Sequence, residues 1–188
     1  MLALPQRAPA RLARAAAAAP RRRAAAPAAA LKPGDNVSSV GATLTTNAGK
    51  AVTLSELTAE RGAVLFMYPR AATSGCTVQA CGFRDNYTAI AAAGFGVYGL
   101  SLDPAAAQTA WAEEHALGYP LLTDTPEAAA LAAFAALKPD DGSGALKILR
   151  SHAVVAKGGA VLLVENGVKS DESFGDALAF VTRHAAGQ

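Results

Sequence analysis

Two uninterrupted apolar runs constrain the fold of this chain more than any other feature. The first, "AVLFMYP", extends from Ala63 to Pro69, and the second begins the stretch "FGVYGLSLD" at Phe95. A strand with one face in water alternates apolar and polar residues, whereas a strand covered on both faces reads as a continuous apolar run. A helix-like pattern follows each run. The sequence therefore predicts a sheet with helices on both faces, an α/β sandwich.

Shorter patterns predict the other strands. The stretch "ATLTTNAGKAVTLSEL" reads as strand, turn and strand, which predicts an N-terminal β-hairpin. A short strand is expected in "YPLLTD", and "RSHAVVAKGGAVLLVENG" reads as a second hairpin that turns at "KGG". With the two buried runs, these segments predict a central mixed sheet.

The segments between the strands predict the helices. An apolar face at helical spacing continues from Ser74 to about Ala93, which predicts one unbroken helix. Asp103 reads as the N-cap of the next helix and Pro104 as its first residue, and the same pattern recurs from Asp124. A closing amphipathic helix is expected in "SFGDALAFVTRHA".

The net charge of +2 conceals an uneven distribution. The first 34 residues hold seven of the 17 basic residues and no acidic one, so ten basic residues face all 15 acidic ones in the remainder. The tail is almost entirely Ala, Arg and Pro, a composition that favours disorder. We expect residues 1–30 to be a transit peptide for a plastid, with a mitochondrion as the alternative, and residues 31–188 to be one folded domain. A nucleic-acid-binding arm is the competing interpretation of "PRRR".

Neither a membrane span nor a metal or other cofactor is expected. No run approaches the roughly 20 apolar residues that cross a bilayer. The three histidines, His115, His152 and His184, are scattered and lack the spacing of zinc ligands.

Both cysteines of the chain lie in the stretch "SGCTVQAC". Cys76 is expected in the first turn of a helix, where open N–H groups and the helix dipole favour a thiolate. Arg70 and Arg84 add positive charge nearby in the sequence, and Thr73 or Ser74 can cap the helix or donate a hydroxyl hydrogen bond to the sulfur. The alternative is that Cys76 is only a small buried apolar residue.

Cys81 lies five residues further along the same expected helix. Five helical steps place the two Cα atoms ~8–9 Å apart on different faces, whereas a disulfide needs about 4.4–6.8 Å. A bond between the two sulfurs therefore requires at least one turn to unwind, which suits a transient bridge better than a structural one.

The stretch "YPRAATSGCTVQACGFRD" closely resembles the active-site segment of the peroxiredoxin Q, or bacterioferritin-comigratory-protein, branch of the peroxiredoxins. The signature Pro-x-x-x-Thr-x-x-Cys of that family falls on Pro69, Thr73 and Cys76, and its resolving cysteine falls on Cys81. The resemblance covers about residues 31–186.

Three positions depart from the usual pattern of the family. Ala72 and Ser74 stand where the family has Asp and Pro, which suggests a less rigid loop. The segment "LRSHAVV" places the active-site arginine of the family on Arg150 and puts His152 where Thr is usual.

The resemblance implies a thioredoxin-like fold and a thiol peroxidase that reduces hydrogen peroxide and organic hydroperoxides in antioxidant defence. Cys76 would attack the peroxide and Cys81 would close an intramolecular disulfide, which thioredoxin or a similar dithiol would reduce. Arg150 and Thr73 would hold the peroxide, and Pro69 would shield the sulfur. An intramolecular resolving cysteine makes a monomer the expected state, with no nucleic acid as partner.

Two other interpretations remain open at this point. A redox-switched binding protein or holdase, with the basic tail as a nucleic-acid arm, would use the cysteine pair without catalysis. A thioredoxin-type disulfide oxidoreductase is the nearer alternative, but it has two residues between its cysteines rather than four. Gln79, Arg84 and Asp85 fit either the helix surface or support of the site, and Trp111 is expected in the core.

Overall fold

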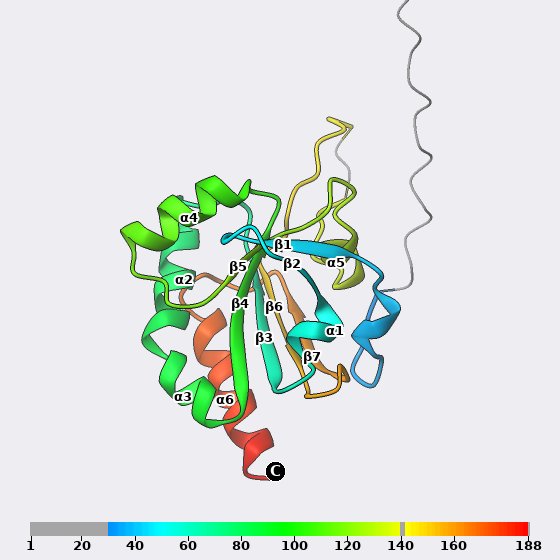
Figure 1. Ribbon diagram of the computed structural model, residues 1–188, viewed down its shortest axis with the longest axis vertical. Coiled ribbons are helices and arrows are strands. Elements are labelled where there is room, and N and C mark those ends of the chain that lie inside the picture. The colour runs from blue at the N-terminus through cyan, green and yellow to red at the C-terminus, as the bar shows by residue number, and fades with distance from the viewer. Residues whose placement is uncertain (1–29, 140–141, 188) are drawn as a thin grey trace, which may run out of the picture.

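The computed structural model describes residues 30–139 and 142–187 (Figure 1). The expected transit peptide lies, apart from residue 30, outside the described residues. The strands are β1 (Thr43–Thr46), β2 (Ala51–Thr53), β3 (Gly62–Met67), β4 (Phe95–Ser101), β5 (Leu121–Thr123), β6 (Ser151–Val155) and β7 (Val161–Asn166). The helices are the 3-10 helix η1 (Val37–Ser39) and the α-helices α1 (Leu54–Leu57), α2 (Ser74–Asp85), α3 (Tyr87–Ala92), α4 (Ala105–Glu114), α5 (Ala129–Ala133) and α6 (Ser173–Ala185).

Within the described ranges, seven strands form one mixed sheet in the order β2-β1-β5-β4-β3-β6-β7. Strand β4 is parallel to both β3 and β5, and the other neighbouring pairs are antiparallel. The N-terminal hairpin (β1 and β2) and the later hairpin (β6 and β7) are both confirmed. The central position of β3 explains its unbroken apolar sequence, because every residue of that strand is buried.

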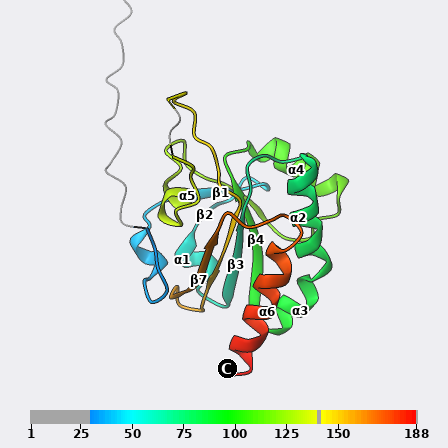
Figure 2. The ribbon, with the colours of Figure 1, turned by 180° about the vertical axis from the view of Figure 1, so that it is seen from behind.

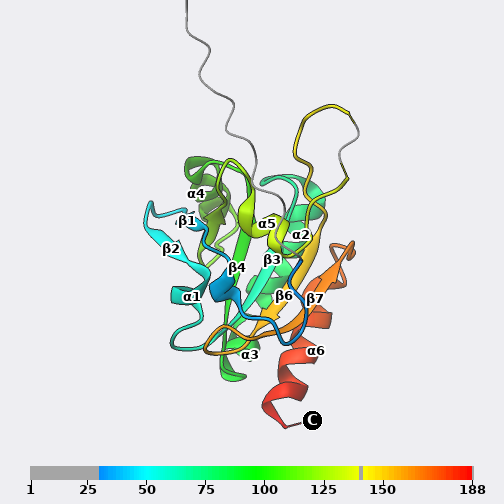
Figure 3. The ribbon, with the colours of Figure 1, turned by 90° about the vertical axis from the view of Figure 1, so that its right-hand side faces the viewer.

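Helices cover both faces of the sheet. Helices α2, α3, α4 and α6 lie on one face, and α1 and α5 lie on the other (Figures 1 and 2). Figure 3 looks onto the face of the sheet that α1 and α5 cover. The core is accordingly divided into two buried clusters, one on each side of the sheet. The expected α/β sandwich is confirmed.

The alternation of side chains along β3 places the two clusters. Val64 and Phe66 point into the cluster beneath α2, α4 and α6, whereas Leu65 and Met67 point into the cluster beneath α1 and α5. Phe66 pairs in register with His152 of β6. Val154, two residues after His152 and therefore on the same face of β6, belongs to the cluster that contains Phe66. The fold therefore directs the side chain of His152 toward α2 and α6.

Three expectations about helices need correction. The expected single helix from Ser74 to Ala93 is broken at Asn86, whose side-chain amide donates to the Gly82 carbonyl at 2.8 Å. Asp103 is not the cap of α4, because its carboxylate accepts instead from the Ala71 N–H at 2.7 Å.

The third correction concerns α5, which is shorter than the sequence pattern indicates. Asp124 lies outside this helix, but its carboxylate accepts from two backbone N–H groups in the first turn, those of Ala130 and Leu131, at 3.3 and 2.8 Å. Burial raises the pKa of Asp124, and these hydrogen bonds partly offset that effect.

Among the described residues, no helix combines the length and apolar character needed to span a bilayer.

Candidate active site

Cys76 lies in the first turn of α2, where the sequence predicts it, and its side chain is buried. The residue is 1% exposed and belongs to the cluster that contains Val64, Phe66 and Tyr68. Helix α2 begins at Ser74 because Thr73 is still extended, with φ −91° and ψ 149°. The thiol is therefore held at a helix N-terminus against the sheet.

Arg150 reaches this thiol from the other end of the sequence. It directly precedes β6, which pairs with β3, and its Nη2 group donates to Cys76 Sγ at 3.4 Å. Gly75 provides the necessary space, since a Cβ there would lie 3.2 Å from Nη2. The arginine thus presents a fixed positive charge to the sulfur. The pairing of Cys76 with Arg150 is the central feature of the site.

Gln79 holds the other arm of the same guanidinium. Its Oε1 atom accepts from Arg150 Nη1 at 2.7 Å, and the whole side chain is buried. Of the two interpretations that the sequence left open for Gln79, the structure supports the one in which it orients the site. Arg84 and Asp85 pair with each other at the surface, at 2.8 Å. They contact neither Cys76 nor Arg150 through any hydrogen bond within the described ranges.

The loop before α2 holds Pro69 and Thr73. The Thr73 hydroxyl donates to the Arg70 carbonyl at 2.9 Å, rather than capping α2 or bonding to the sulfur. Pro69 is exposed at the end of β3. Asp103, which sequence reasoning assigned to a helix cap, also accepts from Ser101 Oγ at 2.9 Å and so fastens this loop to the end of β4.

Both cysteines are free thiols on the same helix, with Cys76 buried and Cys81 partly exposed. Among the hydrogen bonds that secure this helix to its surroundings, two come from aromatic side chains. The indole N–H of Trp111 donates to Thr77 Oγ1 at 3.1 Å, and the Tyr119 hydroxyl donates to the Ala80 carbonyl at 2.6 Å. Unwinding α2 to join the cysteines would break these contacts.

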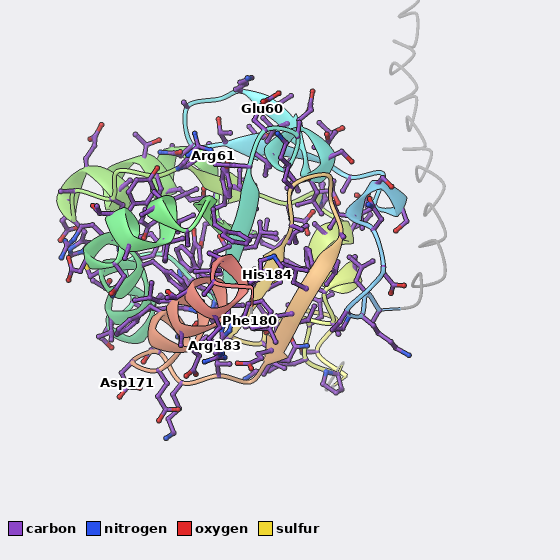
Figure 4. The ribbon with its side chains drawn as sticks, turned by 90° about the horizontal axis from the view of Figure 1, so that it is seen from below. Glu60, Arg61, Asp171, Phe180, Arg183 and His184 are labelled. Atoms are coloured by element: carbon purple, nitrogen blue, oxygen red, sulfur yellow. The ribbon has the colours of Figure 1, made fainter. Side chains whose placement is uncertain are left out.

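The remaining residues singled out from the sequence make no hydrogen bond to the thiol within the described part of the chain. Trp111 is buried, as predicted. His184 is exposed and stacks on Phe180 along α6, with ring centroids 6.3 Å apart (Figure 4). His115 is the C-cap of α4, and its Nε2 atom lies 3.8 Å from Glu114 Oε1. His152, by contrast, is completely buried near the site, which its sequence context does not indicate.

The comparisons with known proteins agree with this geometry. The AhpC/TSA family model matches residues 33–164. Peroxiredoxin bcp1 of Schizosaccharomyces pombe is 37% identical over 153 residues, which cover 81% of this chain and 75% of the yeast protein. Among solved structures, BcpB of Mycobacterium tuberculosis is 33% identical with a TM-score of 0.72, covering 81% of this chain and 97% of that one. The bacterioferritin comigratory protein of Xanthomonas campestris, studied for alkyl peroxide reduction, is 25% identical with a TM-score of 0.72, covering 80% and 99%.

The sheet, its flanking helices and the buried thiol beside an arginine define a thiol-dependent peroxidase with a thioredoxin-like fold. The extent of the family match and the identity to the fission-yeast relative also define the family. The chain belongs to the AhpC/TSA family and is a peroxiredoxin, similar to the Bcp and Q proteins. The protein is therefore an oxidoreductase, and the non-enzymatic switch is not favoured.

Proposed function

We propose that Cys76 is the peroxidatic cysteine of this enzyme. The observation that carries the proposal is the 3.4 Å contact between Arg150 Nη2 and Cys76 Sγ in a buried site. The thiolate attacks one peroxide oxygen, so that an S–O bond forms and the O–O bond breaks. Cys76 becomes a sulfenic acid, and the other oxygen leaves and takes up a proton as water or an alcohol. Arg150 stabilises the negative charge that moves onto the leaving oxygen.

Thr73 and Pro69 complete the proposed peroxide site. The Thr73 hydroxyl donates to the Arg70 carbonyl, and its oxygen can still accept a hydrogen bond from a peroxide O–H group. Cys76 is buried by the cluster that contains Phe66 and Tyr68, and Pro69 is not part of that cluster. The shielding role of Pro69 therefore stays a prediction.

Cys81 is proposed to complete the cycle as the resolving cysteine. Its thiol attacks the sulfenic sulfur of Cys76, which forms the S–S bond and releases water. Thioredoxin or a similar external dithiol then reduces the bridge through a mixed disulfide. Because both cysteines lie on α2, the cycle needs no second subunit, so we propose a monomer.

The site of action is proposed from the tail alone. The acid-free, Arg-rich residues 1–30 favour import into a plastid, with a mitochondrion as the alternative. The relatives from fission yeast and bacteria do not themselves point to a plastid.

A stopped-flow peroxide assay with thioredoxin as reductant tests the cysteine roles. Cys76→Ser is expected to abolish peroxide reduction. Cys81→Ser is expected to retain one round of peroxide reduction while losing turnover with thioredoxin. Oxidation of Cys76→Ser by peroxide at the wild-type rate would overturn the assignment.

A further inference from the structure

A line of buried polar side chains continues beyond Gln79, away from the sulfur. The Gln79 Nε2 atom lies 3.0 Å from Ser173 Oγ, and Ser173 Oγ lies 3.1 Å from His152 Nδ1. All three side chains have no exposed surface. On its far side, His152 Nε2 has no hydrogen-bond partner among the described residues, although it lies 3.3 Å from a carboxylate oxygen of Glu165, which is 43% exposed. The hydrogen-bonded line thus extends from the active-site arginine to a buried histidine on β6.

One arrangement of donors and acceptors gives both the Gln79 amide and the Ser173 hydroxyl hydrogen a partner within this line. Arg150 can only donate, so Gln79 must present its oxygen to the arginine and its NH₂ group to Ser173. The Ser173 oxygen therefore accepts, and its hydroxyl hydrogen is left to donate to His152 Nδ1. That arrangement requires a neutral imidazole with its proton on Nε2, facing the Glu165 carboxylate. His152 thus supplies the last acceptor that the line needs.

The line joins three elements that are distant in the sequence. Gln79 belongs to α2, Ser173 is the first residue of α6, and His152 belongs to β6. Gln79 also lies between the two cysteines. Since the cysteines cannot bond while α2 is intact, opening this turn must separate Gln79 from Ser173. The line therefore exists only in the form of the protein that is ready to react with peroxide.

We propose that Ser173 and His152 are positioning residues that act through Gln79 and have opposite effects on the two thiol steps. They hold Arg150 against Cys76, which favours the reaction with peroxide. They also tie α2 to α6, which retards the opening that lets Cys81 form the disulfide. His152 stands where the resembling family usually has threonine. The inference rests on the proposed roles of Cys76 and Cys81.

The two rates can be measured separately in one protein. Trp111, the single tryptophan of the chain, donates to Thr77 on α2, so its fluorescence should change both on oxidation of Cys76 and on opening of the helix. Stopped-flow traces at increasing peroxide concentration then give a second-order oxidation phase and a peroxide-independent disulfide phase.

Ser173→Ala removes the hydrogen bond to Gln79 directly, and His152→Leu removes the acceptor that orients the Ser173 hydroxyl. We expect each to slow the oxidation phase about tenfold and to accelerate the disulfide phase by a similar factor, the effect of losing one buried hydrogen-bond partner. His152→Asn, which can present an acceptor near the position of Nδ1, is expected to restore most of both rates. Val154→Ala, on the same strand and face but outside the line, is the control for general weakening of the core.

The outcomes separate this inference from the proposed function. If wild type shows no peroxide-dependent oxidation of Cys76, the proposed function fails. If wild type reacts but His152→Leu and Ser173→Ala match Val154→Ala in both phases, the inference fails alone. The inference also fails if both phases slow together, because a merely damaged fold gives that result.

The wild-type protein offers a test that does not depend on how the variants fold. The nitrogen NMR shifts of His152 in the reduced protein should report a neutral ring protonated on Nε2, and they should change when the disulfide forms. Protonation on Nδ1 in the reduced state, or identical shifts in both redox states, would overturn the inference.

Discussion

Ala72, in the loop before Cys76, has a backbone conformation that alanine rarely adopts. Its φ is 58°, in the left-handed region, and the residue is exposed. That region is unfavourable by about 1–2 kcal/mol for a residue with a Cβ, but glycine adopts it readily at a smaller entropic penalty. Ala72→Gly should therefore raise the free energy of unfolding by about 0.5–1 kcal/mol, measured by urea denaturation.

The neighbouring residue provides the control for this change. Ala71 does not have a positive φ and its methyl group packs against the buried cluster, so Ala71→Gly adds flexibility to the unfolded chain, loses that contact and should lower stability by at least about 0.5–1 kcal/mol. A loss of stability in Ala72→Gly as large as that in Ala71→Gly would contradict the argument.

His152 makes the stability of the protein depend on pH. Burial lowers its pKa from 6.5 to about 4, and the charge of Asp176 on α6 only partly opposes this shift. The unfolded chain therefore binds a proton at a higher pH than the folded protein, so stability falls as the pH decreases from about 6.5 to 4. Glu165 on β7 faces the ring and offsets part of the effect, which leaves a loss of roughly 2–3 kcal/mol.

The measurement is a set of urea denaturation curves between pH 7 and pH 4 for wild type and His152→Asn. The carboxylates titrate in both proteins, so the difference between the two curves isolates the histidine. If the two proteins lose stability in parallel as the pH falls, the pKa of His152 does not differ between the folded and unfolded states, and the expected effect is absent.

At the scale of single residues, the sequence predicts the part of the site that is local. Thr73, Cys76 and Cys81 share one short segment, and their spacing alone limits what the thiols can do. Only the family resemblance predicts that Arg150 belongs to the site, because no pattern in the sequence around Arg150 indicates a contact with Cys76. The contact between Gln79 and Ser173 spans 94 residues and joins two side chains of common types. No local pattern could have indicated it.

The packing of α2 against α6 depends on a glycine. A Cβ at Gly82 would lie 2.1 Å from the ring of Phe174, so Gly82→Ala must displace that ring or push the two helices apart. We expect this substitution to lower the free energy of unfolding by roughly 1–3 kcal/mol. Gly175 on α6 has nothing within 4 Å of the corresponding position, so Gly175→Ala should stabilise the helix by about 0.5–1 kcal/mol.

These two variants form a matched pair with opposite signs, read by thermal or urea denaturation. Equal stability changes in both would mean that α2 and α6 do not pack as closely as this geometry requires.

Oxidation is expected to loosen α2 without disturbing the sheet. The ~8–9 Å between Cα atoms five residues apart in a helix must shrink to form the bridge. Several backbone hydrogen bonds are lost, each contributing roughly 0.5–1.5 kcal/mol. Hydrogen exchange of the amides of residues 75–85 should accelerate markedly in the oxidised protein, while β3 and β4 stay protected. Equal protection in both redox states, with the bridge confirmed by mass, would refute the expected opening.

At the scale of elements, periodicity predicts the existence of helices and strands better than their ends. The closing helix α6 has the residues expected, because its amphipathic pattern is long and uninterrupted. The apolar pattern also continues past Asn86, and so conceals the break between α2 and α3. The break depends on one side-chain hydrogen bond to the Gly82 carbonyl. The local pattern predicts that Asp103 caps the helix that follows it. In the structure its carboxylate instead accepts from the Ala71 N–H, which lies 32 residues away and so leaves no local signal.

At the scale of the whole molecule, the folded contacts constrain where the mature chain can begin. Leu31 is buried and its N–H donates to the Ala133 carbonyl at 2.7 Å. We predict that import removes the Arg-rich tail and that the mature protein begins between about residues 28 and 34, and the contacts of Leu31 favour a start within that range that keeps Leu31. N-terminal sequencing of the protein isolated from its native source checks this, and a chain that begins at Met1 or Leu2 would contradict it.

The order of the strands could not be predicted from the sequence, although the strands themselves could. The two buried runs indicate central strands, but β6 inserts beside β3 rather than beside β5, its predecessor in the chain. Short-range patterns do not encode which strands become neighbours, because pairing depends on the total packing of both faces. That pairing is what brings Arg150 to Cys76.

The presence of both thiols on one helix has a consequence for how long a molecule survives in the cell. Proteases cleave segments that can be drawn into an extended form, and a helix opened by the proposed disulfide would offer such a segment next to an exposed loop. Molecules that wait longest for their reductant would therefore be degraded first. When reducing power is scarce, the abundance of the enzyme, and not only its activity, would decline with the supply of electrons.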